Sequence, residues 1–346
     1  MTTARDPLAG KLPVTLLTGF LGSGKTTLLS KLVRHPDMNR VAVVINEIGE
    51  IGIDHDIVTM ASENVALLAN GCICCSVRTD LQDTLRELFG QRRSGQMVQF
   101  DRVVIETTGL ADPAPVVQTL SSDTMLATHY RLDGVVTLLD AVNGPGQIQS
   151  QPEAVKQIAL ADRVFVTKTD LAPPGALEAL TATVADINPG ARVSSLLHGE
   201  IDPHELMGLG LGSARAGAAT LSFLGEPLQG EGSGGERTLA PRSALHDASI
   251  KTLSLRFAKP FTWTAFTSAM ELLTSLRGPD LLRVKGIVNV DGKPVVVQGV
   301  QHVFHEPVEL DRWPSDDTDT RLVFITRRIE AQTIRKLMDA VVEAAG

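Results

Sequence analysis

The sequence predicts an α/β fold with a mostly parallel sheet and helices on both faces, followed by a small α+β domain. Two observations predict the first part: its apolar runs are continuous rather than alternating, and helical patterns lie between several of them. Continuous Val, Leu and Ile runs are typical of strands that are buried on both faces, as in parallel sheets. A change of rhythm near residue 245 predicts the second part.

The predicted strands of the first domain each end in turn residues. They cover 14–19, 41–46, 65–70, 102–106, 134–140, 163–168 and 191–197. The helical patterns cover 25–35, 79–91, 152–161 and 175–187. Strands that alternate with helices in this way indicate parallel strands joined by helical crossovers.

Residues 198–245 separate the two predicted domains. They are rich in Gly and small residues and lack periodicity, which predicts a flexible linker between a domain at 11–197 and a domain at 246–346. The second domain has a turn signal at Asp291-Gly292. Its predicted strands cover 250–257, 286–292, 294–304 and 321–326, and its helices cover 262–276 and 330–345.

Composition and charge exclude several classes of partner. The chain has 346 residues, of which 43% are hydrophobic and 21% charged, as in ordinary globular proteins. A net charge of −8 argues against nucleic acid. The N-terminus lacks the apolar core of a signal peptide, and no apolar run approaches the roughly 18 residues of a membrane span. We therefore expect a cytoplasmic protein with reduced thiols and no membrane partner.

The segment "GFLGSGKTT" (19–27) matches the phosphate-binding loop G-x-x-x-x-G-K-[ST], between a predicted strand and a predicted helix. Glycines let the backbone N–H groups surround the phosphates, and the following helix adds its dipole. We expect Lys25 to contact the β- and γ-phosphates and Thr26 to bind Mg²⁺. The predicted nucleotide contacts here are Gly19, Gly22, Ser23, Gly24, Lys25, Thr26 and Thr27.

Acidic residues end two of the other predicted strands. Glu106 ends "RVVIE", and a carboxylate there would face the phosphates, where it would hold a metal-bound water or polarise the attacking one. Thr26 and Glu106 are thus the predicted magnesium residues. Gly109, three residues further on, would bring its N–H to the γ-phosphate. Asp140 ends the next strand, either in the second sphere of magnesium or as a turn residue.

The segment "TKTD" (167–170) at another strand end suggests recognition of the base. GTPases use Asn-Lys-x-Asp at this place, and the Asp accepts two hydrogen bonds from guanine. Lys168 and Asp170 fit this pattern, whereas Thr167 replaces the Asn. We predict that all three contact the nucleotide.

All three cysteines of the chain, Cys72, Cys74 and Cys75, lie in "NGCICCSV". An odd number of cysteines cannot form a closed disulfide framework. Three thiolates bind Zn²⁺ tightly, and Glu47, Glu50 or a water would complete a tetrahedral site. Soft sulfur excludes Mg²⁺ and Ca²⁺ as natural occupants. A redox pair of C-x-x-C spacing and inert buried cysteines are the alternatives.

Five segments together resemble the CobW-type P-loop GTPases, metallochaperones that include the zinc-regulated GTPase metalloprotein activators. They are "GFLGSGKTTLL", "VVINEIGEIGID", "NGCICCSV", "ETTGLADP" and "GVQHVFHEP", and the resemblance extends from residue 13 to the C-terminal helix. It implies a P-loop NTPase domain, hydrolysis of GTP, and delivery of a transition metal to a client metalloprotein. The metal is most often zinc, and cobalt or nickel in some members.

Two departures from that family stand out. Many members have Asn where this chain has Thr167, and some carry a long His-rich tract that this chain lacks. The second departure weighs against a role in metal storage. The segment 46–57 lies where a GTPase switch would fall, and we hypothesise that GTP orders it and shifts Glu47 or Glu50 relative to the thiolates. The alternative function is a P-loop NTPase or small-molecule kinase with structural or redox cysteines. Neither the client protein nor the oligomeric state can be predicted.

Overall fold

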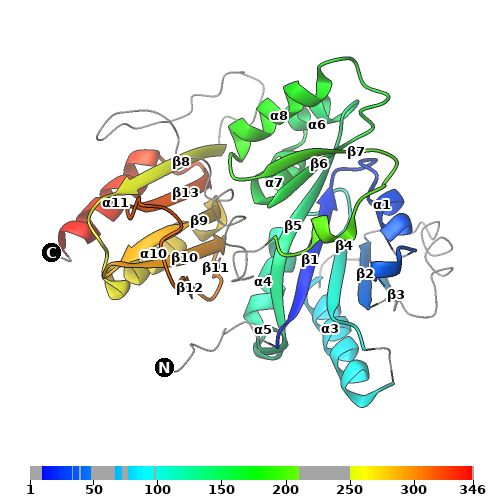
Figure 1. The fold of residues 1–346 in the computed structure, drawn as a ribbon, viewed down its shortest axis with the longest axis horizontal. Helices are drawn as coiled ribbons and strands as arrows, with labels where there is room; N and C mark the ends of the chain where they lie inside the picture. Colours follow the sequence, from blue (N-terminus) through cyan, green and yellow to red (C-terminus); the bar gives the residue numbers. More distant parts are fainter. Residues whose placement is uncertain are drawn as a thin grey trace. The chain divides into compact units, whose positions relative to one another are not determined.

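The structure is a computed structural model, and its described residues form two compact units (Figure 1). The units are Met1–Ala182 with Arg192–Gly210, and Thr183–Ala191 with Leu211–Gly346. The structure describes residues 10–32, 34–38, 40–47, 67–71, 77–96, 99–209 and 250–344, and for residues 46–47, 67–71, 77–80 and 344 only the backbone. No helix in these ranges is long and apolar enough to cross a membrane.

A sheet of seven strands forms the centre of the first unit, and every neighbouring pair in it is parallel. The strand order is β3-β2-β4-β1-β5-β6-β7, so β1 is central. The predicted parallel sheet is confirmed. Its strands are β1 (Leu12–Gly19), β2 (Val41–Glu47), β3 (Leu67–Gly71), β4 (Arg102–Thr107), β5 (Tyr130–Asp140), β6 (Arg163–Thr167) and β7 (Arg192–Leu196).

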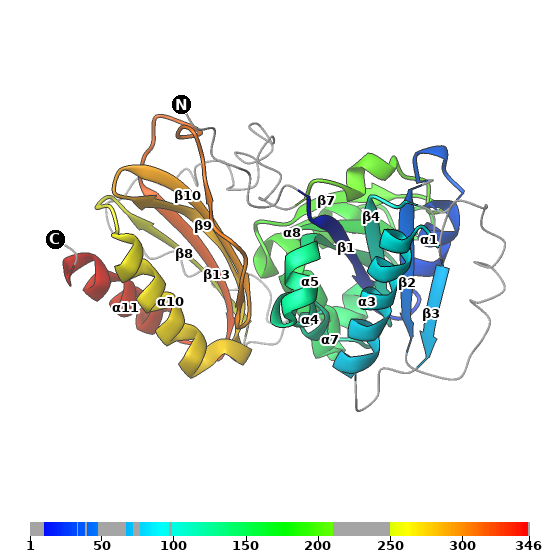
Figure 2. The same cartoon turned by 90° about the horizontal axis from the view of Figure 1, so that it is seen from below.

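Helices cover both faces of this sheet (Figures 1 and 2). On one face, Leu28 and Leu32 of α1 join a buried cluster with Leu17 and Val136. On the other face, the Thr137 hydroxyl donates to the carbonyl of Gln157 in α7 at 2.8 Å. The helices are α1 (Lys25–Leu32), α3 (Val77–Ser94), α4 (Ala114–Ser122), α5 (Thr124–His129), α6 (Gly144–Ser150), α7 (Pro152–Leu160) and α8 (Ala176–Ile187), with a 3₁₀ turn η1 (Pro36–Met38).

Part of the predicted linker belongs to the first unit. Residues 198–209 include a 3₁₀ turn, η2 (Pro203–Leu206), and Leu206 is buried in the cluster beside α1. The Thr15 hydroxyl donates to the Leu206 carbonyl at 3.1 Å. Residues 210–249, which include the rest of the predicted linker (210–245) and the first four residues of the predicted second domain, lie outside the described residues.

The second unit contains an antiparallel sheet in the order β11-β10-β9-β13-β8, with β12 paired to β10. Asp291 and Gly292 both have positive φ, 51° and 88°, as the predicted two-residue hairpin turn requires. The elements are β8 (Ile250–Phe257), α10 (Trp263–Arg277), η3 (Gly278–Asp280), β9 (Leu281–Val290), β10 (Lys293–Val300), β11 (Val303–Phe304), β12 (Val308–Glu309), β13 (Thr320–Arg327) and α11 (Ala331–Ala344).

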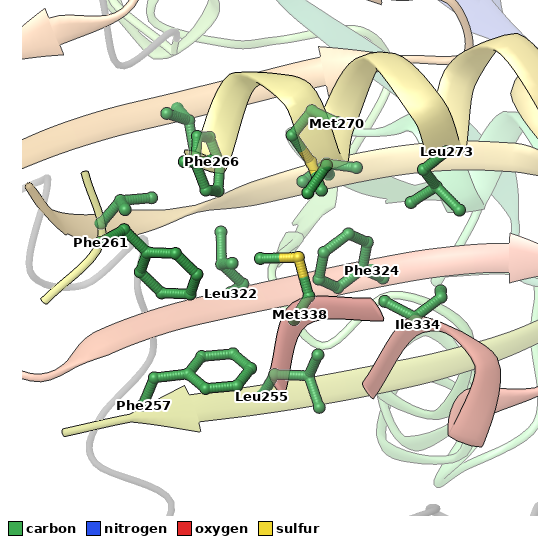
Figure 3. Packing of buried hydrophobic residues seen from close by; sticks show 14 of the residues in the cluster. Leu255, Phe257, Phe261, Phe266, Met270, Leu273, Leu322, Phe324, Ile334 and Met338 are labelled. Atoms are coloured by element: carbon green, nitrogen blue, oxygen red, sulfur yellow. The ribbon is translucent and has the colours of Figure 1, made fainter. Parts of the chain in front are cut away.

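Helices α10 and α11 pack on one face of this second sheet (Figure 2). Phe261 lies between Phe257 and Phe266 and makes an edge-to-face contact with each, at 5.3 and 5.8 Å between ring centroids (Figure 3). Met338 of α11 and Phe324 of β13 extend the same core. Large apolar side chains with few polar atoms therefore hold this domain together.

We predict that Asp133→Asn destabilises the first unit by about 3–5 kcal/mol. Asp133 is fully buried in β5 and accepts hydrogen bonds from Arg102, Arg131 and the Gly208 N–H, so its loss leaves two guanidinium groups without their buried partner. Urea unfolding measures the change. Asp101→Asn removes an exposed pair with Arg40 and serves as the control, with an expected cost below about 1 kcal/mol. Equal midpoints for the two variants would contradict the prediction.

Candidate nucleotide site

The predicted phosphate loop connects the end of β1 at Gly19 to the start of α1 at Lys25. Gly19, Gly22 and Gly24 have φ of 141°, 76° and 96°, in the left-handed region that glycine tolerates best. A Cβ on Gly19 would also lie 2.5 Å from the Leu138 carbonyl oxygen. These glycines are therefore required by the backbone itself, as the motif predicts.

Two polar side chains of this loop, those of Ser23 and Lys25, are buried. Lys25 is 8% exposed, and its Nζ donates to the carbonyls of Gly19 at 2.7 Å and Phe20 at 3.3 Å. The Ser23 hydroxyl is buried and has no hydrogen-bond partner among the described residues. Orphaned buried polar groups are rare in folded proteins, and they indicate a ligand position when they line a loop of this kind. Thr26 is half-buried and Thr27 exposed.

The segment after β4 lies against the phosphate loop. Glu106 is 7% exposed, and its backbone pairs with Leu17 of β1 and Ile45 of β2. A Cβ on Gly109 would lie 2.6 Å from the Leu21 nitrogen, so only glycine allows this close approach. The Thr108 hydroxyl is a second buried group without a partner among the described residues. The structure thus places Gly109 against Leu21 of the phosphate loop, and Glu106 beside Leu17 in the strand that precedes this loop.

Thr167 joins the predicted base loop to the phosphate loop. It is buried at the end of β6, and its hydroxyl donates to the Ser23 carbonyl at 2.9 Å. This contact explains how Thr occupies a position where the GTPase motif has Asn: one short side-chain donor is enough to bridge the two loops. Asp170, three residues further on, is exposed and available to a ligand.

Asp140 and Lys168 form an ion pair that sequence reasoning missed. Lys168 has φ of 57°, and its Nζ donates to Asp140 Oδ2 at 2.7 Å. Asp140 is fully buried and also accepts from the Val142 N–H, the Asn143 N–H and the Asn143 side chain. Burial raises the pKa of Asp140, but the hydrogen bonds from Lys168 and Asn143 outweigh it, so the net pKa lies below its ordinary value. These contacts favour the turn interpretation of Asp140.

The predicted transition-metal ligands fall largely outside the described residues. Cys72, Cys74, Cys75 and Glu50 lie beyond them, and only the backbone of Glu47 is described. In the described part of the chain, no group of three or more His, Cys, Asp or Glu is placed to hold a metal ion. The backbone register pairs Glu47, the last residue of β2, with Gly71, the last residue of β3. Cys72 follows Gly71 directly in the sequence.

We predict that Thr167→Val weakens GDP binding about tenfold, because it leaves the buried Ser23 carbonyl without its donor. Thr167→Ser keeps the hydroxyl and should bind within about threefold of the wild type. Fluorescence titration with a labelled GDP measures both affinities. If the two variants bind alike, the hydroxyl does not connect the loops.

The lowered pKa of Asp140 gives a prediction for pH. A carboxyl group whose folded pKa is depressed contributes stability above its unfolded pKa, and this contribution is lost as the pH falls through the folded pKa. The urea midpoints of the wild type and Asp140→Asn should therefore differ most near neutral pH. The difference should narrow below pH about 4. A constant difference across that range would contradict the assigned charge state.

Comparisons with known proteins agree with this geometry. The family model described as CobW/HypB/UreG, nucleotide-binding domain, matches residues 13–195, and the cobalamin synthesis protein cobW C-terminal domain matches residues 250–342. The zinc chaperone YjiA of Escherichia coli is 35% identical over 332 residues, covering 94% of this chain and 96% of the relative. The zinc chaperone CobW of Pseudomonas aeruginosa is 31% identical over 360 residues, covering 94% and 90%.

A solved structure extends the likeness to three dimensions. The crystal structure of Zn(II)-bound YjiA GTPase from E. coli superposes with a TM-score of 0.68 and 29% identity, covering 96% of this chain and 99% of that chain. Both family models, the relatives and this structure agree over nearly the whole length. The chain belongs to the CobW/HypB/UreG family and is a P-loop GTPase with a CobW-type C-terminal domain.

Proposed function

We propose that this GTPase is a metallochaperone that binds a transition metal, zinc above all, through Cys72, Cys74 and Cys75 and delivers it to a client metalloprotein. The observation that carries the proposal is the backbone register of β2 and β3. Gly71, the residue before Cys72, pairs with Glu47, and the strand of Glu47, β2, is the second strand from β1 in the sheet. The named zinc chaperones among the relatives support the choice of metal. We propose that the protein works in the cytoplasm, where thiols stay reduced and can bind the metal.

The nucleotide chemistry is the hydrolysis of GTP to GDP and phosphate. We assign Lys25 to the β- and γ-phosphates, since its ammonium lies at the loop carbonyls where a phosphate would compete for it. Gly109 brings its N–H to the γ-phosphate, and Glu106 orients or polarises the attacking water. Lys168 and Asp170 hold the guanine base, in the loop that Thr167 connects to Ser23.

The residues at the phosphate loop also fit Mg²⁺. Thr26 in the first turn of α1 and Glu106 at the end of β4 supply the oxygen donors that this ion prefers. The Ser23 and Thr108 hydroxyls, which are buried and have no hydrogen-bond partner among the described residues, support this assignment. Bound Mg²⁺ would offset the negative charge that develops on the phosphates.

Coupling between nucleotide and metal is the core of the proposed mechanism. GTP orders the segment 46–57, which contains Glu47 and Glu50 between the phosphate loop and the cysteines. This ordering shifts a carboxylate relative to the thiolates and changes the affinity for the metal. An incomplete protein shell of three thiolates leaves a position at which a ligand of the client can attack.

The cysteine assignment gives a direct prediction. Replacing Cys72, Cys74 and Cys75 together by Ser should abolish stoichiometric zinc binding, because the hydroxyl does not supply the thiolate that zinc prefers. Single-turnover GTP hydrolysis, measured with Mg²⁺ present and zinc absent, should stay within about threefold of the wild type. Competition with a chromophoric chelator measures the zinc affinity.

The matched control replaces His302 and His305 by Gln, which removes the pair of closely spaced histidines in the second domain. This variant should keep the zinc affinity of the wild type. Unchanged zinc binding in the cysteine variant would favour the alternative function, a P-loop NTPase or small-molecule kinase with structural or redox cysteines.

A further inference from the structure

Gln157 is a buried amide in α7 that sequence analysis did not single out. It is 1% exposed, and its Nε2 donates to two carbonyls of the segment after β4, those of Gly109 and Ala111, each at 3.1 Å. Its Oε1 accepts no hydrogen bond from the described residues. The side chain therefore serves this segment only as a donor, and both of its N–H groups are used.

The two carbonyls belong to a segment that presses against the phosphate loop. Gly109 lies so close to Leu21 that a Cβ would be 2.6 Å from the Leu21 nitrogen. The Ala111 N–H donates to the Thr108 carbonyl at 3.0 Å, which closes a turn around Gly109. The Gln147 side chain of α6 also contacts this part of the phosphate loop, since it donates to the Leu21 carbonyl at 3.3 Å.

The helix that carries Gln157 is itself held in place by burial and by a bond to the sheet. Most of helix α7 is buried, including every residue of its last turn, and the Thr137 hydroxyl of β5 donates to the Gln157 carbonyl at 2.8 Å. The neighbouring Lys156 contacts the same segment through an ion pair with Asp112 at 2.9 Å, but both of these side chains are partly exposed. Ion pairs in water contribute little, whereas a buried carbonyl that loses its donor is costly.

We propose that Gln157 is a positioning residue for GTP hydrolysis. Its amide attaches the carbonyls of Gly109 and Ala111 to α7, which is itself bonded to β5. It thereby holds the Gly109 N–H, and Glu106 three residues earlier in the chain, at the γ-phosphate. This inference rests on the proposed roles of Glu106 and Gly109. GDP lacks the γ-phosphate, so the same contacts have little effect on its binding.

Two variants of nearly unchanged size test the role. Gln157→Met removes both donors, and Gln157→Glu replaces them with a carboxylate that faces the two carbonyls. In the full-length protein, each should lower the single-turnover rate of GTP hydrolysis by about tenfold or more while the GDP dissociation constant changes less than about threefold. Lys156→Gln, the neighbour on the same segment, should hydrolyse GTP within about twofold of the wild-type rate.

The pH dependence separates positioning from general damage to the fold. A protonated carboxyl group can donate one hydrogen bond, so the rate of Gln157→Glu relative to Gln157→Met should rise as the pH falls. Wild-type rates in both variants would overturn the proposal, and so would a loss of GDP binding equal to the loss of rate.

Glu106→Gln tests the proposed function separately. A wild-type rate in this variant overturns the role of Glu106, whatever the Gln157 variants do. If Glu106→Gln is impaired while both Gln157 variants hydrolyse GTP normally, only the positioning role of Gln157 is overturned.

Discussion

The parallel pairing of β1 with β4 and β5 is the constraint on which the site depends. Parallel strands send their carboxyl ends to one edge of the sheet. The register aligns Leu17 with Glu106 and Gly19 with Leu138, so the phosphate loop, the Glu106 segment and the end of β5 emerge together. The same edge receives the end of β3, where the cysteine segment begins. The proposed nucleotide site and the strand that leads into the cysteine segment thus share one edge, which makes the proposed coupling physically reasonable.

Side-chain contacts then fix the loops at this edge to one another. The Thr167 hydroxyl connects the base loop to the phosphate loop, and the Lys168–Asp140 pair connects it to the end of β5. Gln157 connects the segment after β4 to α7, which is itself attached to β5 through Thr137. Strand β5 is thus the common frame for the phosphate loop, the loop after β6 and the segment after β4. Each connection uses a buried group whose loss would leave an unsatisfied partner.

The sequence predicts most of this fold because its signals are strong: continuous apolar runs, a phosphate-loop motif and a hairpin turn. Its failures have physical reasons. Helix α4 was not predicted, because Pro113 is its N-cap residue and Pro115 lies in its first turn. Prolines are typical of turns, although the first turn of a helix also accepts them. Strand β9 begins at Leu281, five residues before the predicted start at 286. The sequence does not reveal this first part because the buried Arg283 and Lys285 interrupt its apolar pattern. Topology predicts that residues at the ends of parallel strands lie at one edge, whereas the partners of Asp140 and the contacts of Gln157 are tertiary contacts that leave no local pattern in the sequence.

In the proposed mechanism, metal and nucleotide are thermodynamically coupled, and calorimetry can measure this coupling. The dissociation constant of a non-hydrolysable GTP analogue is determined for the metal-free and the zinc-loaded protein by isothermal titration calorimetry. We expect the two values to differ, with a ratio equal to the ratio of the zinc dissociation constants measured with and without the analogue, as linkage requires. If the analogue binds both states with the same affinity, metal and nucleotide are not coupled.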